Sequence, residues 1–113
     1  MNKVSTLRRK ADRLFQIAFV KDNPYCLICG HPTSCGHHYI PKSRSNNLRY
    51  DISNLVPLCR SCHFKHHFAG DPHIVEVILQ KRGQEWADDL NERRRIPRRL
   101  NITYLKEVIK ELT

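Results

Sequence analysis

Most of the side chains that could bind a metal ion or transfer a proton lie in one stretch, from Cys35 to His67. Five of the seven histidines and three of the five cysteines fall within it. It begins with the paired His37 and His38, continues through a polar, basic loop to Asn54, and ends with a Cys-x-x-Cys-His unit and two further histidines. Thiolates and imidazoles are the usual zinc ligands, and imidazole also transfers protons near neutral pH. This concentration predicts metal-dependent chemistry.

Two Cys-x-x-Cys pairs, Cys26 with Cys29 and Cys59 with Cys62, have the spacing of zinc ligands. The N-terminus lacks a signal-peptide pattern, and no apolar run is long enough to span a bilayer, so we expect a cytoplasmic protein with no membrane partner. Thiols stay reduced in that compartment, so we expect a structural Zn²⁺ site rather than disulfides or free thiols. Cys35 is left over, as a small buried or surface thiol or as a further ligand.

The histidines have the spacing of a second metal site. His63 and His67 are four residues apart and share one face of a helix, whereas His66 is expected to point elsewhere. His37 and His38 are adjacent on an expected strand and point to opposite sides, so one can bind a metal ion while the other acts as a base. Two imidazoles from a helix and one from a strand leave open positions, which a catalytic metal ion needs. The alternative is that these histidines extend the zinc site or lie on a polar surface.

Apolar periodicity and helix-end signals predict a small α+β domain around these residues. The N-terminal helix should start at Ser5, with its basic side chains mostly off the apolar stripe, as a solvated face or as phosphate contacts. Strands are expected at 37–40 and 55–58, followed by a helix from Arg60 to about Phe68. The expected organisation is one domain over residues 1–113, with an N-terminal helix at 5–21, a metal-binding core at 22–70 and a helical extension at 71–113.

The helical extension has clear end signals. Asp71 and Pro72 should start its first helix, Gly83 should end it, Trp86 indicates a second helix, and a last helix follows Thr103. An arginine-rich run at 92–99 precedes that last helix and is either a solvated connector or a set of DNA contacts. The formal net charge of +9 favours a polyanionic partner, and a nucleic acid is the polyanion that best fits it.

The central stretch resembles the HNH endonuclease family, which uses a ββα-metal fold. The resemblance rests on the segments 38–41 and 54–63, following the first Cys-x-x-Cys pair, and it covers about residues 22–70. The four-cysteine version is common among phage and bacterial HNH proteins. The paired histidines with His63 and His67 are similar to the metal site of colicin DNases. The loop at 43–51 is more loosely similar to the phage recombination protein NinG.

The resemblance implies a metal-dependent endonuclease that hydrolyses DNA phosphodiester bonds in a bacterial cell or phage-infected host, leaving a 5′-phosphate and a 3′-hydroxyl. The residues of the catalytic motif would be His38, Asn54 and His63. His38 would activate water, Asn54 would hold the loop and orient that base, and one divalent cation would be held by His37, His63 and His67. The basic residues expected to contact phosphates are Arg44, Arg49, Arg60 and Lys65.

Many HNH proteins have aspartate where this chain has His37. An all-imidazole site favours zinc, nickel or cobalt over magnesium. The expected cofactors are therefore a structural Zn²⁺ and one catalytic divalent cation: Mg²⁺, Mn²⁺, Ni²⁺ or Zn²⁺. Two alternatives stay open, a non-catalytic zinc-stabilised nucleic-acid-binding protein and a branched-DNA recombination accessory. Double-strand cutting with one site per chain would suggest a homodimer.

Overall fold

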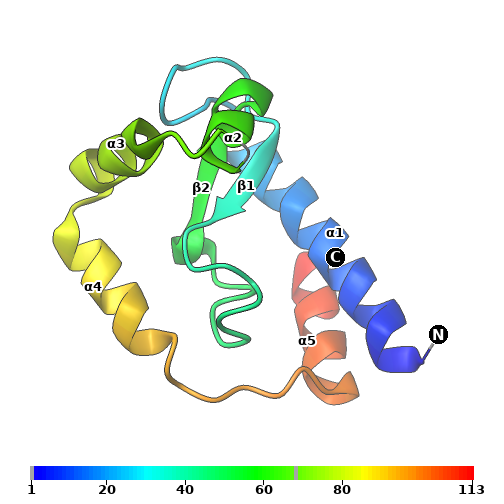
Figure 1. The fold of residues 1–113 in the computed structure, drawn as a ribbon. Coiled ribbons are helices and arrows are strands. Elements are labelled where there is room, and N and C mark those ends of the chain that lie inside the picture. Colours follow the sequence, from blue (N-terminus) through cyan, green and yellow to red (C-terminus); the bar gives the residue numbers. More distant parts are fainter. Residues whose placement is uncertain (1, 68) are drawn as a thin grey trace.

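The computed structural model describes residues 2–67 and 69–113, and it has the α+β fold that the sequence predicted, with a two-stranded sheet between helices (Figure 1). In chain order the elements are α1 (Lys3–Asp22), β1 (Cys35–His38), the 3-10 turn η1 (Ile52–Asn54), β2 (Leu55–Leu58), α2 (Arg60–His67), α3 (Pro72–Arg82), α4 (Gln84–Arg93) and α5 (Ile102–Leu112). Within the described residues, none of these helices has both the length and the apolar character needed to cross a bilayer.

The strands β1 and β2 pair antiparallel, with Cys35 opposite Leu58 and His38 opposite Leu55. β2 occupies the expected residues, but β1 lies two residues before the expected 37–40. The reason is Asn54, whose side chain accepts a hydrogen bond from Ile40 N at 2.8 Å and donates one to Ile40 O at 2.9 Å. Ile40 is therefore held by a side chain instead of by the ladder.

The helix α1 starts at Lys3, earlier than expected, because Asn2 and not Ser5 caps it: the Asn2 side chain accepts a hydrogen bond from Ser5 N at 2.8 Å. Its buried face consists of Ala11, Phe15 and Phe19. Ala11 packs with α5, which lies along α1 in Figure 1, and the two phenylalanines pack on Leu55 of the sheet. The apolar face therefore fixes the rotation of α1 against the sheet.

The helices α2 and α3 cover the side of the sheet away from α1, and α4 lies beyond α3, where its Leu90 packs on Ile40 and Leu48 of the loop after β1 (Figure 1). The expected end of α2 near Phe68 lies outside the described residues. α3 starts as expected, with the Asp71 side chain accepting from His73 N, and ends at Gly83, whose φ of 91° disfavours other residues. α4 is tied to η1 because the Trp86 indole N–H donates to Ser53 O at 2.8 Å.

Gly36 in β1 packs tightly against Phe19 of α1 and Leu55 of β2. A Cβ atom there would lie 2.7 Å from Phe19 Cδ2 and 2.9 Å from Leu55 Cδ1. We therefore expect Gly36→Ala to lower the free energy of unfolding by about 1–3 kcal/mol, the usual cost of overpacking, as measured by urea denaturation. The exposed Ser34→Ala should change it by less than about 0.5 kcal/mol. Equal midpoints for the two variants would contradict this packing.

Candidate functional site

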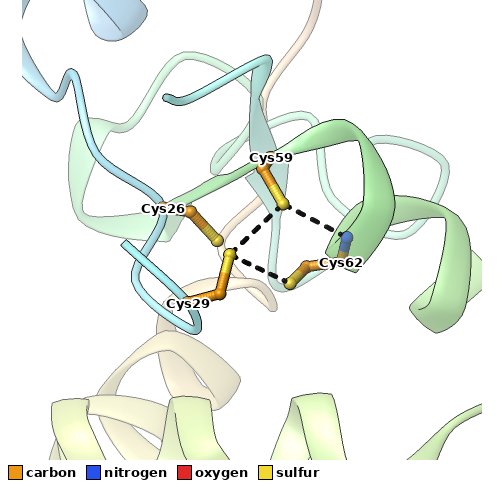
Figure 2. Close-up of side chains that lie close together, drawn as sticks. All are labelled: Cys26, Cys29, Cys59 and Cys62. Carbon is orange, nitrogen blue, oxygen red and sulfur yellow. Dashed lines mark hydrogen bonds between the residues drawn. The ribbon is translucent and has the colours of Figure 1, made fainter. Parts of the chain in front are cut away.

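The four paired cysteines come together at one point, between the turn before β1 and the start of α2 (Figure 2). Their sulfur atoms all lie within 4.8 Å of one another. The Sγ atom of Cys29 is 3.5 Å from that of Cys59 and 3.8 Å from that of Cys62. A disulfide would need about 2.05 Å. Tetrahedral zinc with bonds of about 2.3 Å would separate its sulfur ligands by about 3.8 Å, so the cluster fits structural zinc.

The turn that carries the first cysteine pair is built to present thiolates. Gly30, with φ of 78°, closes it by donating from its N–H to Cys26 O at 3.0 Å. Ile28 N lies 3.4 Å from Cys26 Sγ, and His31 Nδ1 lies 3.1 Å from Cys29 Sγ. Burial raises the pKa of Cys26, but N–H donors outweigh burial and bring that pKa down to about 7. The turn thus favours the ionised, zinc-binding form of Cys26.

A second cluster joins His37 of β1 to His63 and His67 of α2, with their nitrogen atoms within 4.8 Å of one another. The ring centroids of His63 and His67 are 4.4 Å apart, consistent with their shared helix face. Burial, followed by the neighbouring imidazoles, lowers the pKa of His37 to about 3, so its ring is neutral and keeps a lone pair for a metal ion. His37 is buried while His67 is exposed, so the cluster is open to solvent on one side.

The expectation that His66 points away from this cluster was wrong. Its ring centroid lies 4.6 Å from that of His37 and 5.1 Å from that of His67. The reason is helical spacing, because His66 follows His63 by three residues and positions i and i+3 also lie side by side. Four imidazoles therefore meet at this end of α2.

His38 points away from the cluster, and its ring Nε2 lies 2.9 Å from Arg49 O. A carbonyl oxygen only accepts hydrogen bonds, so Nε2 carries the proton and Nδ1 keeps its lone pair. Burial lowers the pKa of His38, and the charges of Lys42 and Arg49 add to this against the opposing effect of the hydrogen bond. His38 is therefore a neutral imidazole in the tautomer that can accept a proton through Nδ1.

Asn54 is completely buried and ties together the two ends of the loop that follows β1. Besides its two bonds to Ile40, its side-chain N–H donates to Leu48 O at 3.4 Å. The sequence predicted that Asn54 orients the base by hydrogen bonds. The direct bond to His38 comes from Arg49 instead, and Asn54 acts one residue earlier, by holding Leu48.

Asp12 of α1 was missed by the sequence reasoning, although it supports this arrangement. Arg49 Nε and Nη2 donate to the Asp12 carboxylate at 2.9 and 2.6 Å, and the Tyr50 hydroxyl donates at 2.8 Å. Burial raises the pKa of Asp12, but these donors outweigh it and lower that pKa overall. The signal in the sequence is that Asp12 is the only acidic residue before Asp22 in a basic helix. Arg49 is paired with Asp12 here, and its contact with phosphate stays a prediction.

A groove of about 880 Å³ lies between α1 and the loop after β1, and both the histidine cluster and His38 border it. Its lining includes His37, His38, His63 and His67. The predicted phosphate contacts Arg44, Arg60 and Lys65 are exposed but lie outside this lining, whereas Lys42 lies within it. Cys35 also borders the groove as a free thiol, and burial raises its pKa.

The arginine-rich run at 92–99 is partly structural. Arg93 pairs with Asp51 and Asp89 and also donates to Ser53 Oγ at 2.9 Å, which anchors α4 to η1 and to Asp51 at its start. The Arg98 guanidinium lies 4.6 Å from the centroid of the Tyr104 ring, which continues the anchoring into α5. These two arginines therefore have partners within the chain, and DNA contact by the rest of the run stays a prediction.

Comparison with known proteins covers the same central part of the chain. Residues 24–69 match the family model of the HNH endonucleases. The chain is 43% identical over 44 residues to anaredoxin of Nostoc sp., covering 37% of this chain and 55% of that protein. It is 47% identical over 46 residues to a mitochondrial DNA mismatch repair protein mutS homolog of Sarcophyton glaucum, covering 37% of this chain and 5% of that protein. The chain thus spans about half of one relative and a small part of the other, and no solved structure matches it significantly.

Proposed function

We propose, starting from the HNH endonuclease domain at residues 24–69, that this chain is a metal-dependent endonuclease that hydrolyses DNA phosphodiester bonds. The observation that carries the proposal is His38, held with Nδ1 unprotonated in the same groove as the cluster of His37, His63 and His67. A protein that only binds nucleic acid needs no such base. For such a protein, the four-cysteine zinc site alone would be enough to stabilise the fold.

The reaction assigned to this groove is attack of water on a phosphorus atom, which breaks the bond from phosphorus to the 3′-oxygen. The leaving oxygen takes up a proton from solvent and becomes the 3′-hydroxyl. His38 Nδ1 takes the proton from the water, and the imidazolium that forms keeps its Nε2–H bond to Arg49 O, so the ring does not rotate during the transfer. Asn54 keeps the loop of Arg49 in place through Leu48 and Ile40. Burial, aided by the positive charges of Lys42 and Arg49, lowers the pKa of His38, so the resting imidazole is neutral and can accept a proton.

The three-imidazole cluster fits a divalent cation. His37, His63 and His67 would hold it through neutral nitrogen atoms, and when bound it would stabilise negative charge on the scissile phosphate and on the leaving oxygen. Nitrogen donors alone favour zinc, nickel or cobalt, and an oxygen-seeking ion such as magnesium binds them poorly. The cysteine cluster would keep its own zinc throughout, since its four positions are filled by protein ligands.

The test is incubation of the zinc-loaded chain with supercoiled plasmid, with magnesium, manganese, nickel or added zinc in separate reactions. We expect conversion to nicked or linear DNA, faster with nickel or zinc than with magnesium, and none with excess chelator. Linear product without a nicked intermediate would indicate two copies acting together. Absence of cleavage with every metal would contradict the nuclease proposal and favour a non-catalytic binding protein. Preferential cutting of branched DNA over plasmid would support the looser likeness to NinG, which stays a prediction.

A further inference from the structure

We propose that α1, which lies outside the matched residues 24–69, forms one wall of the nucleic-acid groove, with Arg8 and Arg9 contacting the phosphate backbone of duplex DNA opposite Lys42. This rests on the proposed function and deepens it, because it states how the substrate is seated at the histidines. The sequence left these arginines open as a solvated face or as phosphate contacts.

The first support is the rotation of α1. The residues of α1 that line the groove are Arg8, Arg9, Asp12 and Gln16, which share one side of the helix. The adjoining side holds Ala11, Phe15 and Phe19, which are buried against α5 and the sheet. Because that packing fixes the helix, Arg8 and Arg9 are held at the groove, next to the histidines that line it.

The second support is the charge left in the groove after its internal bonds are made. Asp12 is neutralised by Arg49, and both ends of the Gln16 amide are used by the Gly36 backbone, at 2.7 and 2.8 Å. Among the described residues, Arg8, Arg9 and Lys42 have no ion pair. The wall therefore presents unpaired positive charge on two sides of the histidines, and a polyanion running past them would be attracted to both sides.

The same helix supplies a matched control. Lys10 and Arg13 are also basic and exposed, but they do not line the groove. Replacing Arg8 and Arg9 with glutamine removes the same charge as replacing Lys10 and Arg13 with glutamine. A general effect of net charge on DNA attraction would affect the two double variants equally, whereas a groove wall would affect only the first.

The experiment measures binding of a fluorescent 20-base-pair DNA duplex to the zinc-loaded full chain at several salt concentrations, with His38→Ala in every protein to prevent cutting. We expect Arg8→Gln/Arg9→Gln to weaken binding about tenfold and to reduce the slope of log K against log salt by about 2, since each phosphate contact contributes about 0.9. Lys10→Gln/Arg13→Gln should leave the slope nearly unchanged. Arg8→Lys/Arg9→Lys, which keeps the charge, should restore most of the slope.

Equal slopes for the two glutamine variants would overturn the proposal, and so would a failure of the lysine variant to recover. Zinc content and thermal unfolding of each variant show that a loss of binding is not a loss of fold. The outcome is separable from the nuclease proposal. If the parent chain cuts DNA but the two glutamine variants have equal slopes, only the role of α1 is contradicted. If the parent chain never cuts DNA but Arg8→Gln/Arg9→Gln alone weakens binding, only the nuclease proposal is contradicted.

Discussion

Replacement of Cys62 by serine should abolish the folded state of the part of the chain around the four cysteines. Cys62 brings α2 to the same point as Cys29 of the turn before β1, and its Sγ lies 3.8 Å from that of Cys29. Structural zinc in small domains contributes an apparent binding free energy of about 10–16 kcal/mol, which matches or exceeds the stability of about 5–15 kcal/mol of a typical domain. Thermal unfolding followed by circular dichroism, together with zinc analysis after dialysis, should show loss of both the transition and the metal.

The matched control is Cys35→Ser. Cys35 belongs to the same small part of the molecule and lies in β1, but its sulfur is not part of the four-cysteine cluster. This variant should keep its zinc and unfold within a few degrees of the parent. A chelator strong enough to strip zinc should reproduce the Cys62→Ser result in the parent. Retention of a normal transition by Cys62→Ser would contradict a structural role for the cluster.

The elements that the sequence predicted well are those whose signals are short in range. The segment Leu55–Leu58 is apolar throughout and became β2 with the expected ends. Asp71 and Pro72 started α3 because cap and proline act within one turn of helix. The meeting of the two Cys-x-x-Cys pairs could be predicted because zinc ligands on tight turns have a recognisable spacing. This held although more than two dozen residues separate the pairs.

The features that were missed depend on contacts between residues far apart in the chain. Asp12 and Arg49 are separated by 37 positions, and only the packing of α1 on the sheet makes them neighbours. The bonds of Asn54 to Ile40 ended β1 earlier than the pattern of residues indicated. The predicted direction of His66 was wrong because the prediction considered only the i, i+4 pair of His63 and His67. His63 and His66, at i and i+3, also lie side by side on a helix.

Replacement of His38 by alanine should reduce DNA cleavage by about 10²- to 10⁴-fold, the usual contribution of a general base, with little change in DNA affinity. The base has Nδ1 unprotonated and Nε2–H bonded to Arg49 O, so alanine removes both the proton acceptor and an anchor of the loop. The measurement is the single-turnover rate of cutting at saturating protein, with affinity determined separately by duplex binding. His73→Ala, which removes an exposed histidine from α3, should leave the rate unchanged.

His38→Gln separates the two roles that alanine removes together. A glutamine amide can still donate a hydrogen bond to Arg49 O, but it does not accept a proton near neutral pH. If His38 acts as the base, His38→Gln should be as inactive as His38→Ala, and added imidazole should restore part of the rate in the alanine variant, where the removed ring leaves space. If His38 serves only to anchor the loop, the glutamine variant should cut nearly as fast as the parent and imidazole should have no effect. Recovery of cutting in His38→Gln would therefore remove His38 from the chemistry while leaving its hydrogen bond to Arg49 as a structural contact.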